Sequence, residues 1–167
     1  MDYRFEPMTE KHRKEVIDIF NYYVENSYAA YFEKKLPYEF FDKLLEMTKG
    51  YPAYVIMNTS ASKVLGFCLL RPHHSSPVFK QTAEITYFIE KDQVGKGIGT
   101  KALKLLEEDG RNMGIKQILA SISSYNEQSI EFHRKNGFLE CGRFLNIGKK
   151  NGNSFDVVWM EKEIGAE

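Results

Sequence analysis

A glycine-rich turn between an expected strand and an expected helix constrains this sequence more than any other segment. Residues 93–100 read QVGKGIGT, with glycine at every second position from Gly95 to Gly99. The preceding segment, Thr82–Ile89, is rich in β-branched and aromatic residues, which favours a strand. In the segment that follows, apolar residues recur at helical spacing from Ile98 to Met113. The chain is therefore expected to pass from a strand, through glycines, onto the N-terminus of a helix.

This turn is suited to binding an anion, because glycines admit a close ligand and the free N–H groups of a first helical turn point at it. The spacing fits two known phosphate motifs poorly. A dinucleotide fold has G-x-G-x-x-G, whereas Thr100 stands here where the third glycine belongs. A P-loop has G-x-x-x-x-G-K-[ST], and in this turn Gly95-Lys96 is followed by Gly97. A glycine turn without a ligand stays open as the alternative.

A second segment indicates which phosphate-containing ligand the glycine turn binds. Asn126–Phe138 reads NEQSIEFHRKNGF. With the glycine turn it resembles the GNAT superfamily of acyl-CoA-dependent N-acyltransferases, whose turn Q/R-x-x-G-x-G/A binds the pyrophosphate of coenzyme A. The later segment of that superfamily is N-x-x-S-x-x-F-Y-x-x-x-G-F. Here His133 stands in place of the tyrosine, as is usual in the phosphinothricin acetyltransferase-like branch. Residues 19–33, 66–84 and 148–160 are also similar to that branch, so the resemblance covers nearly the whole chain.

The order of the expected elements agrees with the fold that the resemblance implies. Strands and helices alternate, which indicates an α/β (α+β) fold with a mixed sheet between helices. The resemblance implies one N-acetyltransferase domain over residues 1–167, with six to seven strands, about four helices, and two strands that splay apart to form the acetyl-CoA cleft. The expected strands are Tyr3–Glu6, Pro52–Asn58, Lys63–Leu70, Thr82–Ile89, Gln117–Ile122, Leu139–Ile147 and Phe155–Glu163, and the expected helices are residues 10–26, Tyr38–Thr48, Ile98–Met113 and Gln128–Asn136.

The resemblance also implies which residues hold acetyl-CoA, the acyl donor. Backbone amides of the glycine turn bind the pyrophosphate, and Val94 occupies the Q/R position of the motif. Asn126 is expected to hydrogen-bond the pantetheine arm, to cap the short helix, or to do both. The implied acetyl-CoA residues are Tyr87, Phe88, Ile89, Val94, Gly95, Lys96, Gly97, Ile98, Gly99, Thr100, Asn126, Ser129 and Phe132.

Acyl transfer to an amine needs a group that removes a proton, because an alkylammonium has a pKa of about 10. Glu84 is the leading candidate, since glutamate is uncommon in strands and alternation places it on one face with Thr86 and Phe88. Aromatic walls would favour its protonated form and suit it to proton transfer near neutral pH. The alternative is a rim residue paired with a surface cation.

His133 is the second catalytic candidate. The resemblance implies that it protonates the departing thiolate or relays the substrate proton, whereas a lone helix histidine is otherwise structural. A backbone N–H at Phe88 or Ile89 is implied as the donor to the tetrahedral oxyanion. His73 and His74 are expected in a solvated loop and not at a metal, because no second cluster of ligands accompanies them.

The acceptor pocket is the least defined part of the expected site. The segment SYAAYFE falls where the branch builds one wall of this pocket, so Tyr28 and Phe32 are expected to line it, with Ser76 and Phe79 from a later loop. The branch usually carries an arginine at the position of Ser76, where it helps to hold a substrate carboxylate. Serine offers no guanidinium. We therefore expect amines without a carboxylate to be the better acceptors, unless a neighbouring cation such as Arg71 reaches into the pocket.

Composition excludes several classes of partner. Lys+Arg and Asp+Glu both number 23, so no net charge attracts nucleic acid or an anionic membrane. No apolar run approaches the roughly 18 residues of a membrane span, and the first residues lack an apolar signal core, so a cytoplasmic protein is expected. Cys68 and Cys141 lie in strand-like runs without CxxC spacing, which indicates buried free thiols.

Together with the resemblance, these features predict an N-acetyltransferase in which the primary amine of a small molecule attacks acetyl-CoA directly in a ternary complex, without a metal. Two alternatives stay open. One is acetylation of a protein N-terminus or lysine, and the other is a coenzyme A-binding regulator without catalysis. The branch tends to form homodimers, so a dimer is expected.

The interpretation of the glycine turn predicts a selective effect of ligands on stability. Acetyl-CoA at about 100 times its Kd should raise the free energy of unfolding by about 2.7 kcal/mol through mass action, whereas NAD and ATP should leave the melting temperature unchanged. Gly97→Leu should abolish the shift, because its side chain would occupy the space of the pyrophosphate. Differential scanning fluorimetry measures each effect, and equal stabilisation by NAD and acetyl-CoA would refute the assignment.

Overall fold

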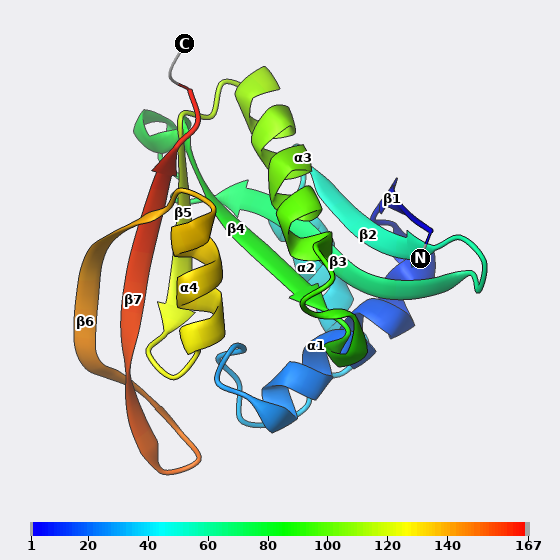
Figure 1. Ribbon diagram of the computed structural model, residues 1–167, viewed down its shortest axis with the longest axis horizontal. Coiled ribbons are helices and arrows are strands. Elements are labelled where there is room, and N and C mark those ends of the chain that lie inside the picture. The colour runs from blue at the N-terminus through cyan, green and yellow to red at the C-terminus, as the bar shows by residue number, and fades with distance from the viewer. Residues whose placement is uncertain (1, 166–167) are drawn as a thin grey trace.

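The computed structural model describes residues 2–165, which form one seven-stranded mixed sheet with helices on both faces (Figure 1). The expected α/β fold with six to seven strands and about four helices is confirmed. The sheet order is β1-β2-β3-β4-β5-β7-β6. The strands are β1 (Tyr3–Pro7), β2 (Ala53–Asn58), β3 (Lys63–Pro72), β4 (Thr82–Ile89), β5 (Gln117–Ser123), β6 (Leu139–Lys150) and β7 (Asn153–Glu163). The helices are α1 (Arg13–Asn26), α2 (Phe40–Met47), α3 (Ile98–Asn112) and α4 (Glu127–Lys135), with short 3-10 helices at Glu10–His12, Pro77–Phe79 and Lys91–Gln93.

The two faces of the sheet carry separate hydrophobic cores. On one face, α3 packs through side chains such as Leu103 against β3, β4, β5 and β7. On the other face, α1 and α2 pack against β2 and β3, with Phe41 fully buried. Because side chains alternate along a strand, Leu70 of β3 belongs to the first core and Leu69 to the second. Figure 1 shows α3 and α2 on opposite sides of the sheet.

The sheet opens between β4 and β5. This pair is the parallel one in the sheet, and its register covers only Thr82–Glu84 against Gln117–Leu119. Beyond Glu84 the two strands diverge, as the resemblance implied. The backbone groups of β4 that face away from β3 after this point have no strand beside them, so the sheet itself creates a gap at its centre.

The C-terminal hairpin forms the far edge of the sheet. Its turn has Asn151 at φ 50° and Gly152 at φ 80°, the left-handed pair that a two-residue hairpin turn favours. The outer strand β6 is exposed along nearly its whole length, and its pairing with β7 is irregular between Phe144 and Gly148. Phe144, Leu145 and Ile147 are therefore large apolar side chains in contact with water.

Some sequence expectations need correction. Thr9 precedes a 3-10 turn, so α1 begins at Arg13, and α2 begins at Phe40 instead of Tyr38. Both cysteines are free, but only Cys68 is buried. The prediction of a buried thiol is wrong for Cys141, because it lies on the edge strand β6 and is exposed. Within residues 2–165, no helix has both the length and the apolar character to cross a membrane.

Close packing at Gly66 predicts a large effect of one methyl group. A Cβ there would lie 2.7 Å from the Phe88 carbonyl oxygen and 3.1 Å from both Ile56 Cδ1 and Ile89 Cα. Gly66→Ala should therefore lower the free energy of unfolding by about 1–3 kcal/mol, as measured by urea denaturation. Gly142→Ala is the matched control, since nothing lies within 4 Å of a Cβ at that position. A loss no greater than that of the control would contradict the close approach of β3 to the end of β4.

Candidate active site

A first cavity, of about 370 Å³, lies between the end of β4, the glycine turn and α4. Gly95 and Gly97 both have φ near +80°, at 81° and 82°, which glycine adopts without strain. The first hydrogen bond of α3 runs from Lys101 N to Gly97 O, so the three preceding N–H groups are free at the helix N-terminus. Free amides and the positive end of the helix dipole together favour a bound anion.

Most of the predicted acetyl-CoA residues line this first cavity. They are Tyr87, Phe88, Ile89, Val94, Gly95, Gly97, Gly99, Thr100, Asn126, Ser129 and Phe132. The side chain of Lys96 instead lies outside and donates to Gln93 Oε1 at 3.2 Å. The side chain of Ile98 is 2% exposed and packs in a small core with Ile56 and Leu65, so only its backbone belongs to the turn.

Helix α4 is fixed against the turn by two local contacts. Asn126 Oδ1 accepts a hydrogen bond from Ser129 N at 3.2 Å, which confirms the expected N-cap. A Cβ at Gly99 would come within 3.3 Å of the Phe132 ring, so the glycine lets α3 and α4 approach closely. Tyr23 of α1 also lines the first cavity, and its hydroxyl donates to the Ile89 carbonyl oxygen.

A second cavity, of about 360 Å³, adjoins the first and contains Glu84. Five residues line both cavities, namely Ala29, Tyr87, Phe88, Asn126 and Ser129. The Glu84 side chain is only 13% exposed, and both of its oxygens are engaged. Arg71 Nη2 donates to Oε1 at 2.9 Å, and His73 Nδ1 lies 3.0 Å from Oε2. Aromatic side chains line this cavity, as expected, but the carboxylate itself is held by Arg71 and His73. Pairing with a cation was the alternative considered for Glu84.

Neither partner of Glu84 was assigned to the site from the sequence, although Arg71 was considered as a neighbouring cation. Arg71 is the cross-strand partner of Glu84 in β3, and it lines the second cavity. His73 was expected in a solvated loop, but its ring contacts Glu84 and packs edge-on against Trp159. No cluster of side chains suited to a metal occurs in the part of the chain that the structure describes.

The second predicted catalytic residue, His133, is 3% exposed and hydrogen-bonded at both ring nitrogens. Its Nδ1 lies 2.6 Å from the Ser129 carbonyl oxygen, which can only accept, so Nδ1 carries a proton. Its Nε2 contacts the Tyr87 hydroxyl and therefore accepts from it. Burial lowers the pKa of His133 to about 4, so the ring is neutral at pH 7. It has no Nε2 proton to give to a thiolate, and the prediction that it is a direct acid needs revision.

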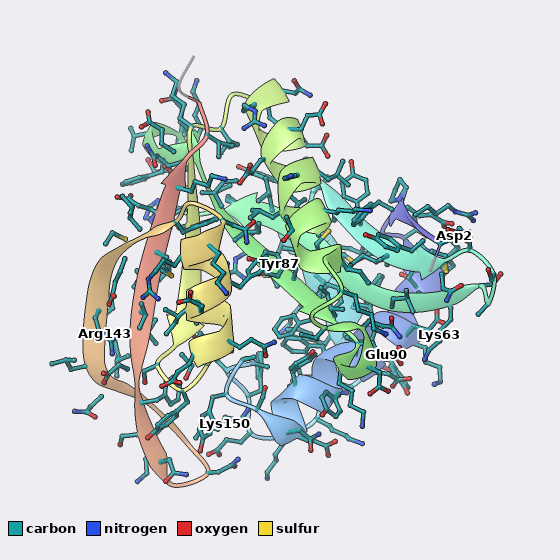
Figure 2. The ribbon with its side chains drawn as sticks, viewed as in Figure 1. Asp2, Lys63, Tyr87, Glu90, Arg143 and Lys150 are labelled. Carbon is teal, nitrogen blue, oxygen red and sulfur yellow. The ribbon has the colours of Figure 1, made fainter. Side chains whose placement is uncertain are left out.

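Tyr87 and His133 both line the second cavity, and Tyr87 also lines the first. Desolvation raises the pKa of Tyr87 well above its usual value, so the phenol keeps its proton. Figure 2 shows Tyr87 between α3 and α4. Because side chains alternate along β4, Tyr87 and Glu84 lie on opposite faces of the strand. The gap beside β4 brings both faces to one cleft.

The two predicted oxyanion donors, the N–H groups of Phe88 and Ile89, point to opposite sides of β4. Glu90 N donates to Leu65 O of β3 at 2.7 Å. Since successive N–H groups point to opposite sides of a strand, the Phe88 N–H also faces β3, where Phe88 is paired with Phe67. The Ile89 N–H faces the gap and the first cavity. Of the two candidates, Ile89 is the one whose amide is directed toward a ligand.

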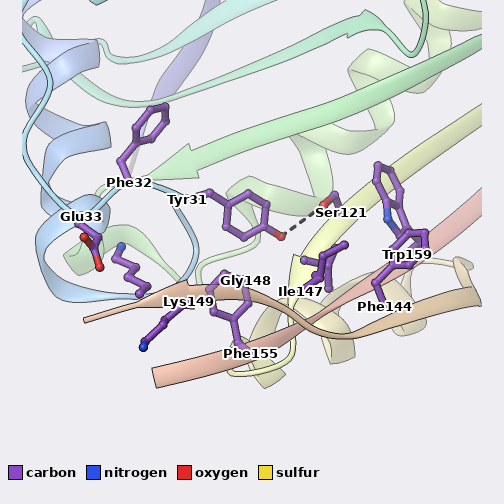
Figure 3. A pocket seen from close by; sticks show the side chains of 12 residues that line it. Tyr31, Phe32, Glu33, Ser121, Phe144, Ile147, Gly148, Lys149, Phe155 and Trp159 are labelled. Carbon is purple, nitrogen blue, oxygen red and sulfur yellow. Dashed lines mark hydrogen bonds between the residues drawn. The ribbon is translucent and has the colours of Figure 1, made fainter. Parts of the chain in front are cut away.

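A third cavity, of about 440 Å³, continues from the second toward the C-terminal hairpin (Figure 3). Phe32 lines the second and third cavities, as predicted for the acceptor pocket. The other predicted acceptor residues, Tyr28, Ser76 and Phe79, line none of the three cavities. Tyr28 instead supports the wall from behind, because its ring packs against Phe155 and Tyr125.

The loop that walls the second and third cavities is fastened by a buried lysine. Lys150 Nζ donates to Ser27 O at 2.7 Å and to Ala30 O at 2.9 Å. Figure 2 shows Lys150 beside this loop. Desolvation lowers the pKa of Lys150, while the two carbonyl oxygens satisfy its ammonium. The hairpin thus fixes the position of the loop after α1.

The neutral state of His133 predicts a dependence of stability on pH. An unfolded histidine has a pKa of about 6.5, whereas the pKa of folded His133 is about 4. As pH falls, the unfolded state binds a proton first, so stability is lost between about pH 6.5 and about pH 4. His133→Gln cannot titrate and should lose about 2 kcal/mol less than the wild type between pH 7 and pH 5, measured by urea unfolding.

The exposed His74 supplies a control for this measurement, since His74→Gln makes the same chemical change at the surface. That variant should follow the wild type at both pH values. His12, a second buried histidine whose pKa burial lowers, is unchanged in all three proteins. An equal loss of stability in His133→Gln and the wild type would contradict a neutral His133.

Comparison with known proteins agrees with this geometry. Residues 16–138 match the Acetyltransferase (GNAT) family. An L-methionine sulfoximine/L-methionine sulfone acetyltransferase of Pseudomonas paraeruginosa is 32% identical over 70% of this chain and 67% of its own length. A phosphinothricin N-acetyltransferase of Streptomyces coelicolor is 26% identical over 95% of this chain and 94% of its own.

Solved structures of acetyltransferases have the same fold. A GNAT superfamily phosphinothricin acetyltransferase from Sinorhizobium meliloti, solved in complex with acetyl-CoA, superposes with a TM-score of 0.91 at 24% identity, covering 99% of this chain and 90% of that one. The family match spans most of the chain, and its motifs meet in one cleft. This chain therefore belongs to the GNAT family of acetyltransferases, in the phosphinothricin acetyltransferase-like branch, and is an N-acetyltransferase.

Proposed function

We propose that this protein transfers the acetyl group of acetyl-CoA to the α-amino group of a small amino-acid-like molecule. The observation that carries the proposal is the pair of Glu84 and Arg71, whose charged atoms lie 2.9 Å apart in a cavity that adjoins the cavity lined by the glycine turn. An α-amino acid carries an ammonium and a carboxylate on one carbon. A carboxylate and a guanidinium side by side are complementary to that pair.

The reaction proceeds by direct attack, with both substrates bound. Glu84 accepts the proton of the ammonium, and the free amine attacks the thioester carbonyl carbon. The Ile89 N–H stabilises the negative charge that develops on the carbonyl oxygen. The nitrogen of the tetrahedral intermediate releases its second proton, and the intermediate expels the coenzyme A thiolate. The thiolate takes the proton of the Tyr87 hydroxyl, whose hydrogen bond to the neutral His133 breaks in this step, and the proton released by the nitrogen restores the phenol. Acetyl-CoA lies in the first cavity, with its pyrophosphate on the amides of residues 97–100.

This proposal revises the expectation drawn from Ser76. That expectation assumed that the substrate carboxylate is bound from the loop before β4. Arg71 on β3 supplies a guanidinium beside Glu84 instead, which supports acceptors that carry a carboxylate. The names of the relatives, which refer to methionine sulfoximine, methionine sulfone and phosphinothricin, favour the same class. They give no support to a regulator without catalysis. A ribosomal-protein-alanine N-acetyltransferase of Brucella melitensis, 28% identical over 96% of this chain, keeps acetylation of a protein as the alternative.

Release of free thiol from acetyl-CoA tests the activity. The panel pairs each amino acid with its decarboxylated amine, such as L-phenylalanine with 2-phenylethylamine and L-methionine with 3-methylthiopropylamine. The amino acid of each pair should have the higher kcat/KM. Higher values for the decarboxylated amines would restore the expectation from Ser76. If the protein binds acetyl-CoA but acetylates no amine of the panel, the result would support a coenzyme A-binding regulator without catalysis.

The role of Glu84 predicts the effect of one substitution. Glu84→Gln should lower kcat by on the order of 10²-fold, because the amide cannot accept the proton, and it should remove the acidic limb of the pH–rate profile. Glu90→Gln is the matched control, since Glu90 pairs with Lys63 at the surface. Binding of acetyl-CoA, measured by calorimetry, should be unchanged in both variants. Full activity of Glu84→Gln across pH would place the base elsewhere.

A further inference from the structure

The third cavity is walled by large apolar side chains, most of which are exposed. Two come from the loop after α1, two from β6 and two from β7 (Figure 3). They are Tyr31, Phe32, Phe144, Ile147, Phe155 and Trp159. Phe144 is 55% exposed and Ile147 is 59% exposed. A volume of about 440 Å³ falls within the range of about 300–1,000 Å³ for small-molecule sites. Exposed apolar side chains gathered around one hollow are typical of a binding site.

The charged side chains at this cavity bind the backbone or point away from the aromatic rings. Glu33 Oε1 accepts a hydrogen bond from Asn151 N at 2.8 Å. The ammonium of Lys150 is held by the carbonyl oxygens of the loop. Lys149 is exposed, and in Figure 3 its side chain points away from the aromatic rings. The surface that a ligand would contact is therefore apolar.

This apolar cavity is continuous with the cavity that holds Glu84. Tyr31, Phe32, Ser121 and Trp159 line both. At the junction, the Tyr31 hydroxyl and Ser121 Oγ lie 3.3 Å apart, as the dashed line in Figure 3 shows. His73, which contacts Glu84, packs edge-on against Trp159, and Trp159 lines both cavities. A molecule whose amine lies at Glu84 can therefore extend past this junction to the aromatic walls beyond it.

We propose that the third cavity is the subsite for the side chain of the acceptor, and that the acceptor is an amino acid with a large apolar or aromatic side chain. The inference rests on the proposed function, because it takes the amine to lie at Glu84. A side chain with an anionic group, as in glutamate or phosphinothricin, would lose its hydration against these walls without gaining a partner. The subsite thus distinguishes acceptors that share the same α-amino and α-carboxylate groups.

The first test compares such acceptors by thiol release. L-phenylalanine, L-leucine and L-methionine should exceed L-alanine in kcat/KM by about 10- to 100-fold, the factor that burial of a large apolar side chain provides. L-glutamate and phosphinothricin should fall below L-alanine. A preference for alanine, glutamate or phosphinothricin would overturn the inference and leave the proposed function standing. Failure of every amine, with acetyl-CoA bound, would overturn both.

Neighbouring residues of β6 supply a matched pair of variants. Phe144 lines the third cavity, whereas Leu145, 70% exposed, does not. Phe144→Glu should lower the ratio of kcat/KM for phenylalanine to that for alanine at least tenfold, and Leu145→Glu should leave the ratio unchanged. An equal fall in both variants, with a change of oligomeric state by analytical ultracentrifugation, would show that this face joins copies of the chain and would overturn the inference.

Discussion

The short pairing of β4 with β5 is the constraint on which the rest of the site depends. Their register ends after three residue pairs, at Glu84 and Leu119. Backbone N–H and C=O groups that lose a strand partner must find another. At Ile89 the carbonyl oxygen takes the Tyr23 hydroxyl, and the N–H stays directed toward the cleft. The opening also lets groups from opposite faces of one strand, Glu84 and Tyr87, line the same cavity.

Two hydrogen-bonded units flank this opening, and they have opposite electrostatic character. Glu84 is held by Arg71 and His73, so its environment is polar and rich in donors. Tyr87 and His133 are desolvated and neutral, and burial lowers the pKa of His133 to about 4. Groups whose environments differ in this way are suited to different proton-transfer tasks. In the proposed mechanism, the polar unit accepts a proton on the acceptor side, and the neutral unit supplies one on the coenzyme side.

The C-terminal hairpin fixes the position of the loop after α1, which walls the second and third cavities. Lys150 ties the loop after α1 to the hairpin through two carbonyl oxygens, and Tyr31 of that loop reaches across to Ser121 of β5. The walls of the second and third cavities are therefore positioned by contacts between segments far apart in the sequence. A rigid wall reduces the entropy that a substrate must lose when it binds. This arrangement accounts for a well-formed third cavity on an otherwise exposed edge of the sheet.

The sequence by itself determined the elements that local pattern controls. The run of β-branched and aromatic residues gave the bounds of β4, and the glycine spacing gave the turn onto α3, because strand propensity, helix period and left-handed glycines are local properties. The family motifs gave the residues expected to hold acetyl-CoA, most of which line one cavity. Only the tertiary structure decided that Arg71 and His73 hold Glu84, that His133 is neutral, and that Ile98 is core while Cys141 is exposed. Cross-strand register, burial and the edge of a sheet arise from pairing between distant segments, so a local pattern cannot specify them.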